Sequence, residues 1–278
     1  MRRSWIHIVL FVLTVASTWV TGGLSYCIAI MLILLGHEMG HYFMSRRNGM
    51  MATLPFFLPL PIISPFGTLG AVIRMESPIP SRKALFDTGV AGPLISFLLS
   101  APAIFLGLRL SEAIPASQIK GPVIRLADPL LFSFIQELVM KGVPSSYEVM
   151  VHPIAYAGWV GLFVTAFNLL PVGQLDGGHI AYALFGKKSR NIFAIAIGTM
   201  AFIFVFYSIV WFLPLVLMVL FGFRHPMPLD DQIPLDTKRK LVGGLVFLFL
   251  ILSFTPSPFP EAPSLIRIME KGFQAFQM

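Results

Sequence analysis

The feature that most constrains this chain is a pair of histidines with a glutamate inside a long apolar segment, His37-Glu38-Met39-Gly40-His41. Ionisable residues at such a place are costly and are typically functional. Apolar runs recur along the 278 residues, which are 56% hydrophobic and only 12% charged. Because runs of roughly 18 or more apolar residues predict membrane spans, the chain is predicted to be an all-α polytopic membrane protein.

The apolar runs predict about six to seven transmembrane helices in a single membrane-embedded domain, residues 1–278. The run at 192–221 would form a helix roughly 45 Å long, which exceeds a hydrocarbon core of about 30 Å, so we expect a hairpin of two short spans there. C-terminal helices are expected over about 191–255. A signal peptide is the alternative for the first run, but no clear cleavage site follows it, and we favour an uncleaved span. The predicted runs are 5–20, 24–44, 88–108, 154–185, 192–221 and 241–254.

The basic residues predict the orientation of these spans. Most of the 20 Lys and Arg residues fall on one side of the membrane if the N-terminus, with Arg2 and Arg3, is cytoplasmic. We therefore expect a multi-pass protein of the cell (inner) membrane with a cytoplasmic N-terminus. The same bias accounts for the net charge of +7, and without a dense basic run we predict no nucleic-acid partner.

One segment is predicted to enter the membrane without crossing it. Residues 50–75 are apolar but contain four prolines between Pro55 and Pro65, which prevent a continuous helix. Non-helical backbone at membrane depth requires protein or a wet cavity to satisfy it, so we expect a re-entrant segment beside a cavity. Within it, residues 67–73 could form a short strand, and the segment as a whole a β-hairpin.

The histidines predict a metal centre. On a helix, His37 and His41 share one face, and Glu38 flanks them in a position to act on a water molecule. A catalytic zinc takes three protein ligands, so a third is expected from another span at similar depth. The polar cluster at 168–179 offers it, because Asp176 lies eleven residues before Lys187 and His41 five before Arg46, both toward the predicted cytoplasmic half. The alternative is a polar patch that merely packs helices.

These motifs together resemble the site-2 protease family of intramembrane zinc metalloproteases. The chain contains that family's HExxH motif and its later Leu-Asp-Gly motif, here Leu175-Asp176-Gly177. It also contains the accompanying motifs Gly67-Thr68-Leu69-Gly70-Ala71, Ala91-Gly92-Pro93 and His152-Pro153. The resemblance covers a catalytic core of about 24–186. No room remains for the PDZ or CBS domains of many members, so we expect a compact member.

The resemblance implies one Zn²⁺ per chain, bound by His37, His41 and Asp176, with Glu38 as the general base. Asn168 would help to hold substrate or stabilise the oxyanion. Many members have proline directly after this Asn, but here Pro171 follows later, so we expect a later helix break. His179 could be a further ligand, although we favour a supporting or channel-lining role.

The predicted function is hydrolysis of peptide bonds in or near transmembrane segments of membrane-bound regulators. A substrate must unwind to expose its carbonyls, and it could then pair with the strand edge around Gly67, Thr68 and Gly70. The predicted partners are therefore a transmembrane substrate and the lipid bilayer, and the oligomeric state is left open. The alternatives are a divalent-metal transporter and a helix-binding pseudoprotease without catalytic activity.

The remaining acidic residues receive structural interpretations. Asp87 is predicted to cap the third span beside Thr88. Asp230, Asp231 and Asp236 lie among prolines in a cytoplasmic loop and are predicted to be solvated.

Overall fold

A computed structural model describes residues 5–119, 123–144, 146–221 and 227–276. Arg2 and Arg3, on which the predicted orientation partly depends, lie outside these ranges. The α-helices are α1 (Trp5–Arg47), α2 (Arg82–Arg109), α3 (Leu130–Val139), α4 (Pro153–Asn168), α5 (Asp176–Phe185), α6 (Ser189–Phe206), α7 (Phe212–Phe221), α8 (Thr237–Ser253) and α9 (Leu265–Phe276). The strands and 3₁₀ turns are β1 (Phe56–Pro59), β2 (Thr68–Val72), β3 (Glu112–Pro115), β4 (Tyr147–Met150), η1 (Ala116–Gln118), η2 (Gly186–Lys188) and η3 (Ile209–Trp211).

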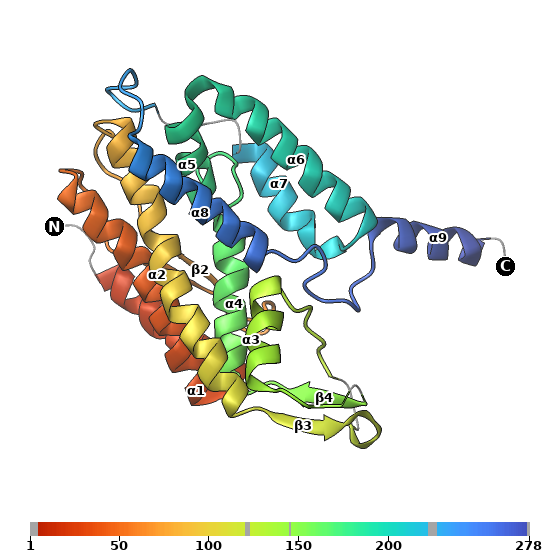
Figure 1. The fold of residues 1–278 in the computed structure, drawn as a ribbon. Coiled ribbons are helices and arrows are strands. Elements are labelled where there is room, and N and C mark those ends of the chain that lie inside the picture. The colour runs from red at the N-terminus through yellow and green to blue at the C-terminus, as the bar shows by residue number, and fades with distance from the viewer. Residues whose placement is uncertain (1–4, 120–122, 145, 222–226, 277–278) are drawn as a thin grey trace.

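Helix α1 folds back on itself at Gly23, whose φ of 77° and ψ of −179° are not helical. The hydroxyl of Thr18 donates to the Cys27 sulfur at 3.3 Å, although a straight helix would separate these residues by about 13 Å along its axis. The halves 5–22 and 24–47 therefore lie side by side (Figure 1). This arrangement matches the two runs predicted at 5–20 and 24–44.

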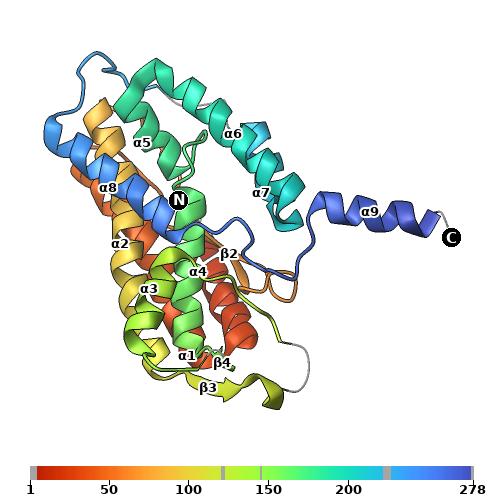
Figure 2. The ribbon, with the colours of Figure 1, turned by 45° about the vertical axis from the view of Figure 1, so that its right-hand side comes forward.

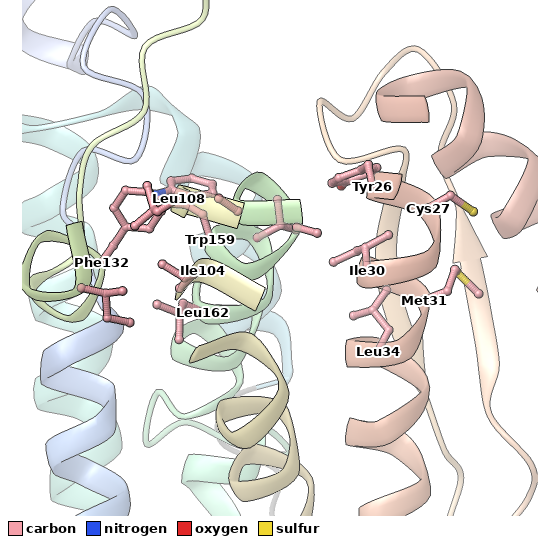
Figure 3. Packing of buried hydrophobic residues seen from close by; sticks show 14 of the residues in the cluster. Tyr26, Cys27, Ile30, Met31, Leu34, Ile104, Leu108, Phe132, Trp159 and Leu162 are labelled. Atoms are coloured by element: carbon pink, nitrogen blue, oxygen red, sulfur yellow. The ribbon is translucent and has the colours of Figure 1, made fainter. Parts of the chain in front are cut away.

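The second half of α1 packs with α2 and α4 to form the largest apolar cluster among the described residues. Figure 3 shows its members, including Ile30 from α1, Ile104 from α2 and Trp159 from α4. In a bilayer, helices associate through close packing, which small residues permit. At Gly158 of α4, an added Cβ would lie 2.9 Å from the Ile104 backbone nitrogen, so α4 can approach α2 this closely only with glycine there.

Strands β1 and β2 form an antiparallel hairpin between α1 and α2, with Phe56 opposite Val72 and Phe57 opposite Ala71. The strand predicted at 67–73 is therefore present. The first half of α1 fastens both ends of this hairpin, because the His7 ring lies 3.1 Å from the Pro55 carbonyl and the Ser17 hydroxyl donates to the Gly67 carbonyl. Whether residues 50–75 re-enter the membrane stays a prediction.

A second two-stranded sheet, which the sequence does not predict, lies at one end of the molecule. Strands β3 and β4 pair antiparallel, with Glu112 opposite Met150, and Figure 1 shows them beyond the lower ends of α2 and α4. Each strand has only four residues, and more than thirty residues separate them in the sequence. Such short, distant strands carry too little alternation to be recognised from the sequence.

The predicted cap at Asp87 is wrong. Helix α2 begins earlier, at Arg82, and its N-cap is Ser81, whose hydroxyl accepts from the Ala84 amide at 3.2 Å. Asp87 therefore lies within the helix, where its carboxylate accepts two hydrogen bonds from Arg239 of α8, at 2.7 and 2.6 Å. This bidentate pair ties the N-terminal end of α8 to α2.

The acidic loop before α8 is also more ordered than predicted. Asp236 caps α8 by accepting from the Arg239 amide at 3.0 Å. Asp231 accepts from Arg82 Nε at 2.8 Å and from the Tyr182 hydroxyl at 3.1 Å. The Arg82 guanidinium holds the pKa of the Asp231 carboxyl below its usual range. Asp231 thus connects this loop to α2 and α5, because Arg82 and Tyr182 from distant segments meet it. Asp236 is exposed, but it also caps α8 rather than being merely solvated.

Three helical stretches in the described part of the chain are long and apolar enough to cross a membrane, Trp5–Arg47, Arg82–Arg109 and Asp176–Phe206. The last comprises α5 and α6, which are separated by Gly186 with a φ of 58°. The predicted run at 192–221 is divided at Tyr207 and Ser208 into α6 and α7, as a hairpin requires. The chain is thus a mainly helical membrane protein, and its exact number of spans stays a prediction.

Candidate metal centre

His37 and His41 stand one turn apart on the second half of α1, and both side chains are buried. Residues four positions apart share a helix face, so the two imidazoles point into the same space. Their Nε2 atoms are 3.1 Å apart. The sequence prediction that both rings serve one centre therefore agrees with their geometry.

Helix α2 fixes the orientation of the His41 ring. Nδ1 of His41 lies 2.7 Å from the Thr88 carbonyl oxygen, which can only accept a hydrogen bond. The neutral ring must then carry its proton on Nδ1, which leaves the Nε2 lone pair available for a metal ion. The ring itself occupies space beside Gly92, where an added Cβ would collide with Nε2.

Asp176 reaches the histidines from the start of α5. Helix α4 ends at Asn168, so the helix break falls directly after the asparagine and not later, as Pro171 had led us to expect. A turn of residues 169–175 then leads to Asp176, the first residue of α5. Its carboxylate oxygens lie 3.2 Å from His37 Nε2 and 3.2 Å from His41 Nε2. A helix N-terminus also favours a negative charge at this position.

The three side chains fit a metal ion. Their ligand atoms all lie within 4.8 Å of one another. Ligands about 2.0–2.1 Å from a tetrahedral zinc are separated by about 3.3 Å, close to the distances between these atoms. Asp176 Oδ2 is buried and lies 3.2 Å from His37 Nε2, but it makes no hydrogen bond in the structure, which is costly unless a cation meets it. Two imidazoles and one carboxylate are a donor set typical of catalytic zinc.

A cavity of about 1050 Å³ opens beside this cluster. Glu38 lines it, next to His37, and its carboxylate faces the backbone amide of Ile73 at the end of β2. Asn168 also lines it, and its Nδ2 lies 3.4 Å from His37 Nε2. The cavity therefore combines an acid–base group, an amide and three potential metal ligands with space for a bound molecule.

Comparison with known proteins identifies the family to which the chain belongs. The model of peptidase family M50 matches residues 25–210, which include all three potential ligands and Glu38. The chain belongs to peptidase family M50. The resemblance to site-2 proteases seen in the sequence is thereby confirmed.

Several curated relatives of this M50 chain are named as probable zinc metalloproteases. It is 29% identical over 231 residues to "Probable zinc metalloprotease EGY2, chloroplastic" of Oryza sativa subsp. indica, covering 82% of this chain and 42% of that protein. It is 30% identical over 243 residues to "Probable zinc metalloprotease EGY1, chloroplastic" of Arabidopsis thaliana, covering 86% of this chain and 44% of that protein. The chain thus spans less than half the length of these relatives.

The residues predicted to bind substrate divide into two groups in this M50 chain. Asn168 lies at the centre, as described above. His179, for which a supporting or channel-lining role was favoured, also lines the cavity. Gly67, Thr68 and Gly70 are not among the lining residues of the cavity. They shape the hairpin instead, because Gly67 has a φ of 72° and the Thr68 hydroxyl accepts from the Gly70 amide at 2.9 Å. Their role in substrate binding stays a prediction.

The sequence placed Thr88 beside a predicted helix cap and Gly92 in a family motif, but it assigned neither residue a role at the candidate metal centre. Thr88 acts through its backbone carbonyl, which no side-chain motif can reveal. Gly89 and Gly92 are three positions apart on one helix face, and each would meet the site if it carried a Cβ, at His179 and His41 respectively. Small residues at this spacing inside a span predict close packing, but not that the neighbour is a metal ligand.

Proposed function

We propose that this M50 chain is an intramembrane zinc metallopeptidase that hydrolyses peptide bonds in or near transmembrane segments of membrane-bound regulators. The observation that carries the proposal is the convergence of His37, His41 and Asp176 with Glu38 beside them, at the wall of a cavity between membrane-length helices. The names of the curated relatives agree with this chemistry.

The chemistry divides between the ion and the protein. His37, His41 and Asp176 would hold one zinc per chain, which when bound lowers the pKa of a water ligand and polarises a carbonyl oxygen. Glu38 would accept a proton from the attacking water and deliver it to the leaving amine nitrogen. The Asn168 amide would donate a hydrogen bond to the carbonyl oxygen, on which negative charge develops in the transition state.

Strand β2 offers a means of holding an unwound substrate. In the described part of the chain, the sheet contains only β1 and β2, so one edge of β2 has no strand partner. Residues 71–73 of β2 and its extension line the cavity beside Glu38. A substrate segment added as a third strand would satisfy its exposed backbone groups and would bring a peptide bond close to the metal centre.

Removal of the metal tests the proposed function. We expect the purified protein to contain about one zinc per chain and to cleave a transmembrane reporter protein in detergent or vesicles. A chelator should abolish cleavage, and added zinc should restore it, because three neutral or anionic ligands without the ion cannot polarise a carbonyl. Metal analysis and gel analysis of the reporter measure both quantities.

The same preparation separates the peptidase from its alternatives. A His41→Ala variant should lose both zinc and cleavage, whereas an exchange on the distant β3 strand, Ala113→Ser, should change neither. Zinc uptake into vesicles without any cleavage would instead indicate a transporter. A wild-type protein that binds the reporter but never cuts it would indicate a pseudoprotease.

The strand-addition step can be tested with two neighbouring prolines, Ala71→Pro and Val72→Pro. Successive amides of a strand point to opposite edges, so one proline removes a donor facing β1 and the other removes a donor facing the open edge. If substrate adds to β2, both variants should cleave poorly while retaining zinc. Val72→Ala, which keeps the amide, should cleave normally. Normal cleavage by the variant that lacks the donor on the open edge would contradict strand addition.

The membrane placement is part of the proposal. We propose six to seven spans, a re-entrant hairpin at about 50–75, and a cytoplasmic N-terminus in the cell membrane. Support comes from the basic side chains near the cytoplasmic ends predicted for α1, α2 and α6, Arg46, Arg47, Arg82, Lys187 and Lys188. These two relatives carry the word chloroplastic in their names. In a plant, the corresponding membrane would therefore be one that encloses or lies within a plastid.

A further inference from the structure

The last helix, α9, is amphipathic and stands apart from the rest of the molecule. Leu265, Ile268 and Met269 follow the i, i+3, i+4 spacing of one helix face, and Arg267, Glu270 and Gln274 lie on the other. Figures 1 and 2 both show α9 projecting away from the helix bundle, connected to it only near its N-terminal end. Its apolar face is largely open, since Ile268 is 42% and Met269 is 65% exposed.

The position at which α9 leaves the bundle corresponds to a membrane boundary. Lys187 and Lys188 precede α6 and mark one boundary, and the 18 residues of α6 rise about 27 Å, nearly the thickness of the hydrocarbon core. Helix α6 ends at Phe206, and the side chains of Phe206 and of the following Tyr207 are about half exposed. Tyrosine is enriched at membrane–water interfaces, so Tyr207 supports placing the C-terminal end of α6 at the opposite boundary.

The linker before α9 is held at this same depth. The Pro263 carbonyl accepts from the Ile209 amide at 2.9 Å, and the Pro256 carbonyl accepts from Trp211 Nε1 at 2.8 Å. Ser264 then caps α9 by accepting from the Arg267 amide at 3.3 Å. Because Ile209 lies directly after the C-terminal end of α6, α9 begins at the membrane boundary.

We propose that α9 lies in the membrane surface opposite Lys187 and Lys188, with Ile268 and Met269 inserted among the lipids and Arg267 and Glu270 in water. A helix of 12 residues is marginally stable alone in water and needs a surface on which to bury its apolar face. Lipid at the end of α6 is the nearest apolar phase, and an amphipathic helix at this depth lies flat in the interface. This surface contact goes beyond the peptidase activity and does not depend on it.

Site-specific fluorescence in vesicles tests the proposal. Cys27 is the chain's one cysteine and is buried, so Cys27→Ser provides a background for the single exchanges Met269→Cys and Glu270→Cys. Each variant is labelled with a polarity-sensitive fluorophore and reconstituted into phosphatidylcholine–phosphatidylglycerol vesicles. Lipids brominated on their acyl chains should quench more than half of the fluorescence at position 269, and aqueous iodide should quench mainly at position 270. Ile268→Cys and Arg267→Cys provide a second matched pair.

The outcomes are distinct. Equal quenching of both faces by iodide would place α9 in water and overturn the proposal. Protection of position 269 from both quenchers would show a protein partner, such as a second copy of the chain, and would also overturn it. The zinc content of the labelled variants shows that the bundle has folded, so a failed surface contact is distinguishable from a failed metal centre.

Discussion

Replacement of Glu38 by glutamine is expected to abolish peptide cleavage while leaving zinc content unchanged. Glu38 lies in the cavity beside His37 but is not one of the three side chains that converge as potential ligands. Glutamine has nearly the same shape, yet it cannot take a proton from water. Loss of a positioned acid–base group typically costs about 10²–10⁴ in rate, so cleavage of a reporter should fall by at least a hundredfold.

The measurement compares two properties in one preparation, metal content and the initial rate of reporter cleavage. A matched control is Glu112→Gln, the same chemical change on an exposed strand far from the cavity. It should retain both properties. If Glu38→Gln lost zinc together with activity, the glutamate would belong to the metal site rather than act as the base, and the proposed division of roles would be wrong.

The candidate metal centre could be recognised in the sequence because membrane-length segments contain few ionisable residues. His37, Glu38 and Asp176 are conspicuous against an apolar background, and the i, i+4 spacing of the histidines fixes their shared face without further information. The strand at 67–73 could be anticipated for a similar reason, because the four prolines between Pro55 and Pro65 exclude a continuous helix through the segment that contains it. In each case, the deciding constraint is local in sequence.

What could not be predicted depends on contacts between distant segments. Nothing near Asp87 or Asp231 indicates that Arg239 and Arg82 meet them, so both acids received interpretations based on their neighbours alone. The two apolar runs at the start predict a turn between them, but not that Gly23 makes this turn with a positive φ. The Thr88 carbonyl, likewise, becomes a partner of His41 only when α2 packs against α1.

Exchange of Gly92 for alanine is expected to remove zinc and activity together, although Gly92 contributes no ligand. The added Cβ would occupy the position of the His41 ring, which is held on its other side by the Thr88 carbonyl. Because Thr88 and Gly92 belong to the same helix, α2 cannot move away from the ring without also lengthening the hydrogen bond that fixes its tautomer. We therefore expect a loss of zinc affinity of about 10–100-fold, as for other disruptions around a metal ligand.

The control for this exchange is Gly198→Ala in α6, where an added Cβ meets nothing within 4 Å. Alanine is the better helix former by roughly 0.5–1 kcal/mol, so this variant should be at least as stable as the wild type and should retain zinc and cleavage. The comparison separates the effect of a methyl group on a helix from its effect on His41.

Full zinc content in Gly92→Ala would mean that His41 binds metal in another orientation, and the Thr88 carbonyl would then not set the geometry of the site. Loss of zinc in Gly92→Ala but not in Gly198→Ala would show that α2 determines the geometry of the metal centre. It would do so through the absence of a side chain at Gly92 and through the Thr88 carbonyl oxygen.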